Sequence, residues 1–225
     1  MKEKVDISTW NRKLAYTTFK DYTDPYTGIV AKLDVTNLVN LCKQNNLSFY
    51  GSMTYFVLKS MIGIDAFYFG YGKTGNEYSV YKYDNIAATV TVMDNNNELN
   101  FTRYIEYIDD LDKFMFNFSI AVKDASNGIP YYKIKNLENM NKVNITCIPW
   151  ISFSNFKDAN NSSEKSSKSK ICWDKYYFND NKYFIDVSLL VNHAFQDGYH
   201  MGLFFQNLQQ EVYNIETDKR LKKVR

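Results

Sequence analysis

Cysteine and histidine are scarce in this chain of 225 residues, which has three of the first and two of the second. The cysteines Cys42, Cys147 and Cys172 are odd in number and widely spaced, a pattern typical of free thiols in a reducing compartment. Because no two of them form a Cys-x-x-Cys pair, the sequence lacks the zinc sites that are built on this motif. It also lacks a glycine-rich phosphate-binding loop, and we expect no metal site.

Net charge is low and long apolar runs are missing. The formal net charge of +2 is too small to indicate a nucleic-acid surface, and no basic helix accompanies it. No segment approaches the roughly 20 apolar residues that a membrane-spanning helix needs, and residues 1–6 lead into no apolar run typical of a secretory signal. We therefore expect a cytoplasmic protein whose partner is a small molecule, with no membrane and no nucleic acid.

Apolar and aromatic side chains are plentiful, at 45% and 17% of the chain. Such a composition is typical of globular proteins, and the length fits one domain over residues 1–225 that buries a substantial core. No internal repeat is found. The sequence therefore predicts a single domain.

The spacing of apolar residues predicts alternating strands and helices. Strands are expected over residues 27–35, 78–83, 87–93, 99–104, 143–148 and 183–191. Helices are expected within 7–19, around Leu38 and Cys42, and over 51–63, 109–125 and 198–215. The first of these helices is expected to turn Trp10, Leu14 and Phe19 inward. The polar segment 155–170 has few aliphatic residues, so we expect an exposed, mobile loop there.

A histidine stands where the last predicted strand ends. His193 follows the apolar run 183–191, Asp197 lies four residues on, and Gly198 gives a freely turning backbone before the helix. Such a junction exposes a side chain at the rim of a sheet while the scaffold holds it still. Two interpretations are open: a structural histidine at a strand end, or a catalytic one.

The pattern His193-x-x-x-Asp197-Gly198 resembles the active-site signature of the chloramphenicol acetyltransferases and the wider group of CoA-dependent acyltransferases. Three further segments resemble that family in its order and at roughly its spacing. They are Trp10-x-Arg12, Phe49-Tyr50 and the strand 144–153 with Pro149-Trp150. The resemblance implies an α+β fold, a two-layer sandwich in which helices cover a large, mainly antiparallel or mixed β-sheet. It also implies a homotrimer with active sites between subunits.

The resemblance implies acetyl transfer from acetyl-CoA, as a co-substrate, to a hydroxyl group, without a covalent acyl-enzyme. Such a reaction needs a base for the hydroxyl proton and a donor for the oxyanion of the tetrahedral intermediate. His193 suits the first task because an imidazole titrates near neutral pH. Thr146 stands at the position of the family's oxyanion-stabilising serine, and Arg12 at that of the arginine that pairs with Asp197. Read without the family, Thr146 is an ordinary strand threonine and Arg12 a solvated surface arginine.

Five further positions are candidates for ligand contacts. Phe19, Phe156 and Tyr50 are candidates for lining the acceptor pocket, although these aromatic residues fit plain core packing equally well, and by resemblance Cys172 would line it too. Lys175 would meet a phosphate of CoA, or it is a surface lysine.

The sequence also departs from the family pattern. Asn192 replaces a second histidine, Asp158 falls where a leucine is usual, and Cys172 falls where a threonine is usual. Chloramphenicol is the acceptor that the family implies, with antibiotic resistance as the role. Two alternatives stay open: a different hydroxyl acceptor, which suits the polar segment 155–170 better, or a catalytically weak trimeric scaffold protein.

Overall fold

The computed structural model describes residues 1–129, 137–161 and 164–217. Its strands are β1 (Lys2–Lys4), β2 (Tyr26–Asp34), β3 (Phe69–Thr74), β4 (Glu77–Tyr83), β5 (Asn85–Met93), β6 (Asn100–Glu106), β7 (Met140–Cys147), β8 (Lys170–Trp173), β9 (Tyr177–Asn179) and β10 (Lys182–Asn192). Its α-helices are α1 (Lys13–Phe19), α2 (Thr36–Asn45), α3 (Phe49–Met61), α4 (Leu111–Ser126) and α5 (Gly198–Tyr213). Short 3₁₀ helices cover Asp65–Tyr68, Leu137–Asn139 and Asn214–Thr217.

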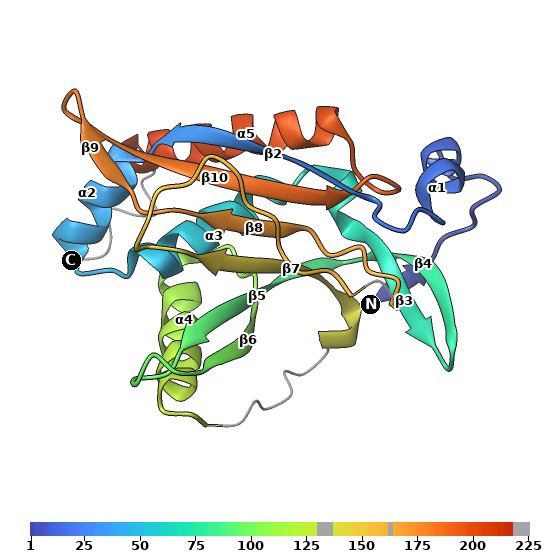
Figure 1. Cartoon of the computed structure of the whole chain (residues 1–225), viewed down its shortest axis with the longest axis horizontal. Helices are drawn as coiled ribbons and strands as arrows, with labels where there is room; N and C mark the ends of the chain where they lie inside the picture. Colours follow the sequence, from blue (N-terminus) through green and yellow to red (C-terminus); the bar gives the residue numbers. More distant parts are fainter. Residues whose placement is uncertain (130–136, 162–163, 218–225) are drawn as a thin grey trace.

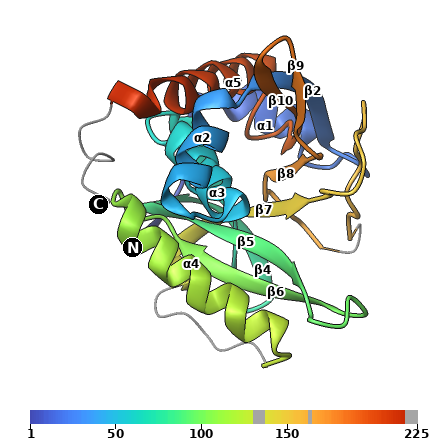
Figure 2. The same ribbon diagram turned by 90° about the vertical axis from the view of Figure 1, so that its left-hand side faces the viewer.

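The strands form two sheets. The large one has the order β2-β10-β8-β7-β5-β6, with β9 added to β10, and the small one has the order β1-β4-β3 (Figure 1). Neighbours in the large sheet are antiparallel except for the parallel pairs β5–β7 and β7–β8. Helices α2, α3, α4 and α5 lie on one side of the large sheet (Figure 2). The expected α+β fold with a mixed sheet covered by helices is confirmed.

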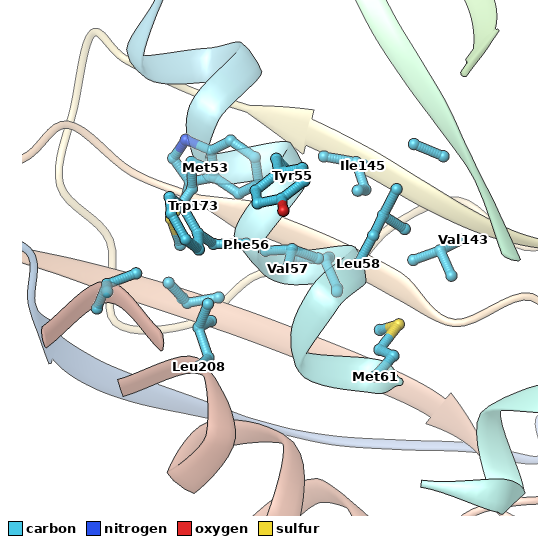
Figure 3. Packing of buried hydrophobic residues seen from close by; sticks show 14 of the residues in the cluster. Met53, Tyr55, Phe56, Val57, Leu58, Met61, Val143, Ile145, Trp173 and Leu208 are labelled. Carbon is cyan, nitrogen blue, oxygen red and sulfur yellow. The ribbon is translucent and has the colours of Figure 1, made fainter. Parts of the chain in front are cut away.

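Strand alternation places the core between this sheet and the helices. On β10 the side chains of Ile185, Val187, Leu189 and Val191 are fully buried toward the helices, as alternate positions of a strand require. They belong to the same cluster as residues of α3 and Trp173 of β8, which are labelled in Figure 3. The next positions along each strand therefore point to the opposite face of the sheet, which we call the outer face.

The segment before β8 covers part of this outer face. Its first half is largely exposed, as expected, but Ser167 and Ser169 are each only 4% exposed. The Ser167 hydroxyl accepts a hydrogen bond from the backbone N–H of Tyr71 at 2.7 Å. The prediction of an exposed loop over 155–170 is therefore wrong at its C-terminal end, because small hydroxyl side chains satisfy buried backbone groups there.

The structure also differs from other expectations. β1, β3, β8 and β9 fall outside every strand that the spacing of apolar residues predicts. In β3, Gly72 lets the Tyr81 ring approach, since a Cβ there would lie 2.5 Å from that ring. Leu14 is 81% exposed and does not belong to the inner side of α1. Trp10 and Phe19 do pack inward, in a small cluster with Phe195.

Candidate functional site

The turn between β10 and α5 carries His193, and the preceding Asn192 joins this turn to the segment at Ser166. The Asn192 side chain is 2% exposed, donates to the Ser166 carbonyl at 2.8 Å and accepts from the Ala194 N–H at 3.0 Å. The N–H of His193 itself donates to the Pro25 carbonyl at 2.8 Å. The asparagine that departs from the family pattern is therefore a buried hydrogen-bonding residue of this turn.

The imidazole of His193 lies flat on the ring of Phe19. The ring centroids are 4.1 Å apart and the planes meet at 18°. Nδ1 is buried and has no hydrogen-bond partner among the residues described here. Stacking on Phe19 therefore orients the ring, while no protein hydrogen bond within the described chain selects its tautomer.

Arg12 and Asp197 form an ion pair, with Arg12 Nη1 3.1 Å from Asp197 Oδ2. The other oxygen of Asp197 is 2.8 Å from His200 Nδ1 and accepts from the Tyr199 N–H, which caps α5. Burial acts to raise the pKa of Asp197, but the hydrogen bond from Arg12 and the neighbouring His200 hold it below its usual value. The structure thus brings together the two residues that the sequence motif pairs.

A small aromatic cluster packs against the residues that follow His193 in the turn. Phe195 packs edge-on against Tyr71 at 4.9 Å, and Trp10 packs against Phe69 at 5.1 Å. Gln196 is fully buried and donates from Nε2 to the Ala66 carbonyl at 2.7 Å. Sequence reasoning missed these supports, because their partners lie on β3 and the turn before it.

Thr146 and Cys172 lie side by side on the outer face. They are direct partners in the parallel pair β7–β8. Thr146 is half-buried and Cys172 is fully buried. Burial raises the pKa of the Cys172 thiol to about 12, so this residue offers packing volume and no nucleophile.

Thr146 and His193 of one chain lie far apart. Cys172 pairs in turn with Ser188 on β10, which places Thr146 level with Ser188, two strands away. His193 lies five residues beyond Ser188, so the Cα atoms of Thr146 and His193 are on the order of 19 Å apart, at about 3.3 Å per residue and 4.8 Å per strand. A base and an oxyanion donor must both lie within about 3 Å of the reacting groups. One chain cannot bring these two side chains to one substrate.

Phe156 lies in the segment that crosses the outer face. Its ring packs on Phe153 at 5.9 Å. The next two residues make ion pairs. Lys157 pairs with Asp24, in the segment before β2, at 3.4 Å, and Asp158 lies 3.9 Å from Nζ of Lys170 on β8. Three predicted acceptor residues are thus divided between two places: Phe19 lies on α1 against the His193 ring, whereas Cys172 and Phe156 lie at the outer face.

Lys175 stands at a separate cavity of about 500 Å³. Aromatic side chains dominate its wall, and they are Phe49, Tyr50, Trp150, Trp173 and Tyr176. Tyr50 donates from its hydroxyl to the Thr91 and Ile145 carbonyls, and burial raises its pKa. An exposed ammonium beside aromatic rings is suited to a ligand with a planar ring and a phosphate.

No group of three or more His, Cys, Asp or Glu side chains is placed to hold a metal ion in residues 1–129, 137–161 and 164–217. Over the same ranges, every helix is too short or too polar to cross a membrane.

Comparison with known proteins matches most of the chain to one family. The family model described as "Chloramphenicol acetyltransferase" matches residues 2–209. The chain is 26% identical over 214 residues to a chloramphenicol acetyltransferase of Clostridium perfringens, covering 95% of both chains. It is 27% identical over 207 residues to one of Escherichia coli, covering 92% of this chain and 91% of the relative.

Solved structures share the fold. A chloramphenicol acetyltransferase structure superposes with a TM-score of 0.80 at 20% identity, over 94% of this chain and 100% of that one. A structure of the cubic core of the pyruvate dehydrogenase multienzyme complex superposes with a TM-score of 0.64 at 11% identity, over 96% of this chain and 93% of that one. At these identities the structural likeness concerns the fold alone.

Proposed function

The chain belongs to the chloramphenicol acetyltransferase family, and on this premise we propose that it transfers an acetyl group from acetyl-CoA to a hydroxyl group of chloramphenicol. As a member of this family the protein is an acyltransferase. The observation that carries the proposal is the turn after β10. There His193 stacks on Phe19, and the Arg12–Asp197 ion pair lies at the N-terminus of α5. We propose that residues 1–225 form one domain with one kind of active site.

In the proposed reaction His193 takes the proton of the acceptor hydroxyl as its oxygen attacks the thioester carbonyl. The tetrahedral intermediate carries a negative oxygen, to which the Thr146 hydroxyl donates a hydrogen bond. When the intermediate collapses, the C–S bond breaks, the ester remains on the acceptor, and the imidazolium returns its proton to the CoA thiolate. The acceptor attacks directly, so no covalent acyl-enzyme forms.

The separation of Thr146 from His193 supports a site that two copies of the chain share. In the proposed homotrimer, His193 of one subunit faces the outer face of its neighbour, where Thr146 and Cys172 lie. Residue Leu14, which is 81% exposed on α1 near the His193 turn, suits such a contact.

For acetyl-CoA we propose the cavity at Lys175. Its aromatic wall suits the adenine ring, and the lysine is free to meet a phosphate from its exposed position. Thr91 and Cys147 also line this cavity, and Cys147 is the residue after Thr146. The cavity therefore lies at the C-terminal end of β7 on the helix side of the sheet, whereas the Thr146 side chain is on the outer face.

A different hydroxyl acceptor is the second candidate. The Lys170 side chain is 6% exposed and lies 3.9 Å from Asp158, so a charged pair stands in the segment to which the family pattern assigns an apolar pocket wall. A weak trimeric scaffold protein is a third possibility. Retention of His193 together with its Arg12–Asp197 support argues against it, since a site without chemistry has no need of an oriented base.

Release of the CoA thiol tests the proposal directly. The full chain is incubated with acetyl-CoA and chloramphenicol, beside the variant His193→Ala. A positioned base contributes about 10² to 10⁴ in rate, so we expect thiol release to fall by that factor in the variant. Equal rates in both proteins, or no release with any alcohol in a panel, would contradict the proposal.

A further inference from the structure

The second histidine of the chain lies on the first turn of α5, close to the turn that carries His193. The His200 side chain is 16% exposed, and its Nδ1 lies 2.8 Å from Asp197 Oδ1. Asp197 is the N-cap of α5 and His200 is the third residue of the helix, two positions whose side chains face each other at a helix start. The proposed reaction gives His200 no task, although it contacts a residue of the site motif.

The proton on Nδ1 of His200 can be assigned from its two neighbours. The backbone N–H of Asp197 lies 3.3 Å from the same nitrogen. Nδ1 can donate to the carboxylate or accept from this N–H, and it cannot do both. Burial acts to raise the pKa of Asp197, but the hydrogen bond from Arg12 and the neighbouring His200 hold it below its usual value, so the carboxylate is ionised near neutral pH. A hydrogen bond to an ionised oxygen is the stronger of the two, and we assign the proton to Nδ1.

Both oxygens of the Asp197 carboxylate are therefore held by side-chain donors. Oδ1 accepts from Nδ1 of His200 at 2.8 Å and from the Tyr199 N–H at 3.1 Å. Oδ2 accepts from Arg12 Nη1 at 3.1 Å. Rotation of a carboxylate about its terminal bond has broad minima, so its plane is fixed by its hydrogen bonds. His200 supplies the shorter of the two hydrogen bonds to Oδ1, and so limits where Asp197 can offer Oδ2 to Arg12.

Arg12 connects this carboxylate to the imidazole of His193. Arg12 is the N-cap of α1, the helix of seven residues that ends at Phe19. The Phe19 ring stacks on the imidazole at 4.1 Å, and His193 Nδ1 has no hydrogen-bond partner within the described part of the chain. The orientation of the His193 ring therefore depends on the placement of Phe19. A shift of Arg12 would move a short helix whose far end makes this contact.

We propose that His200 is a positioning residue for the acetyl transfer. It acts through Asp197 and Arg12 on the placement of α1, and so on the imidazole of His193. This inference rests on the proposed function and adds a residue that the motif His193-x-x-x-Asp197-Gly198 does not contain. The alternative role is that of a helix cap alone. Removal of a cap would lower the stability of the protein and leave the turnover of the folded protein unchanged.

Two substitutions of His200 separate the donor from the ring. His200→Phe keeps a flat ring and removes the donor, whereas His200→Asn keeps a nitrogen donor attached to Cγ, where Nδ1 stands. Misplacement of a base by about 1 Å can cost about 10² in rate, so we expect kcat to fall by about 10 to 10² in His200→Phe and to stay within about threefold in His200→Asn. Gln206→Phe, at an exposed position of the same helix, is the matched control and is expected to keep kcat within about twofold.

Two further measurements test the route from His200 to the site. The KM for acetyl-CoA is expected to change by less than about twofold, because the cavity proposed for acetyl-CoA lies between α3, β5, β7 and the end of β8. In the double variant with Asp197→Ala, His200→Phe is expected to lower kcat no further, within about twofold, because the carboxylate through which it acts is gone. Urea unfolding and circular dichroism give the folded fraction to which each kcat is referred.

The outcomes distinguish this inference from the proposed function. Thiol release that depends on His193 but is equal in the wild type and His200→Phe would overturn the inference and leave the proposed function standing. An equal loss in His200→Phe and His200→Asn, or a further loss in the double variant, would overturn the route through the Asp197 carboxylate. No thiol release by the wild type with any alcohol would remove the proposed function and this inference with it.

Discussion

Arg12 and Asp197 are 185 positions apart in the sequence, and their side chains meet at 3.1 Å beside the turn that carries His193. Asp197 has two tasks at once, because it also caps α5 through the Tyr199 N–H. The ion pair joins the start of the chain to its last helix. The segment of α1 that provides Phe19 is thereby held against the imidazole.

The two tasks of Asp197 can be separated by two substitutions. Asparagine caps a helix as well as aspartate does, so Asp197→Asn removes the ion pair and keeps the cap. Misplacement of a base by about 1 Å can lower a rate by about 10², and we expect kcat to fall toward that extent while KM for acetyl-CoA changes little. Asp197→Ala also removes the helix cap, so its free energy of unfolding is expected to fall by about a further 1 kcal/mol. Steady-state kinetics and urea unfolding of both variants check this, and an unchanged kcat in Asp197→Asn would contradict it.

Because of the same ion pair, the free energy of unfolding is expected to depend on pH. The folded-state pKa of Asp197 is lowered, so its contribution to stability is complete above the usual aspartate pKa of about 3.9 and is lost as pH falls through the folded-state pKa. The difference in unfolding free energy between the wild type and Asp197→Asn is expected to be largest near neutral pH and to shrink below about pH 4. Urea unfolding at neutral and acid pH measures it. A difference independent of pH would show that the carboxylate charge does not matter.

Asn192 is expected to be structural. Asn192→Ala leaves the Ser166 carbonyl and the Ala194 N–H without their partner, and each orphaned buried group costs about 1–3 kcal/mol. We expect a loss of about 2–6 kcal/mol in unfolding free energy, measured by urea denaturation. The matched control is Asn160→Ala, an exposed asparagine whose loss is expected to stay within about 0.5 kcal/mol. Similar values for both variants would refute the role of Asn192 in the turn.

The proposed role of the Thr146 hydroxyl can be tested with two conservative substitutions. Thr146→Val keeps the shape and removes the hydroxyl, so kcat is expected to fall by about 10² to 10³ if that hydroxyl stabilises the oxyanion. Thr146→Ser keeps the hydroxyl and is expected to stay within about tenfold of the wild type. Steady-state kinetics with saturating acetyl-CoA distinguish the two. Equal activity of Thr146→Val and wild type would identify Thr146 as an ordinary strand residue.

A site shared between subunits predicts recovery of activity from two inactive variants. His193→Ala and Thr146→Val are unfolded together in equal amounts and refolded as mixed assemblies. A quarter of the sites in a randomly mixed ring combine an intact His193 with an intact Thr146, so about a quarter of wild-type activity is expected. Each variant refolded alone is the control. No recovery in the mixture would contradict a site that combines His193 of one chain with Thr146 of another.

Much of the fold follows from patterns of neighbouring residues in the sequence. Alternation of apolar residues predicts β10, and the helical spacing of Met201, Phe204 and Leu208 predicts α5, because side chains recur every two residues in a strand and every 3.6 in a helix. The turn motif His193-x-x-x-Asp197-Gly198 is also local, since Asp197 caps the helix that begins at the next residue. The resemblance to the family then supplied the expected fold, which the structure confirms.

The sequence by itself thus determined strands β2, β5, β6, β7 and β10 of the large sheet, the helices that cover it, the position of His193 at a strand end, and the residues to be paired with it. Only the tertiary structure decided that Ser167 and Ser169 are buried, that the glycines of β3 belong to a strand, and that Thr146 and His193 of one chain lie too far apart to act together. Periodicity is a short-range property, whereas these features depend on strand order and register, which join segments distant in the chain. β8 lies between β7, which holds Thr146, and β10, which ends before His193, and no pattern along the sequence measures that distance.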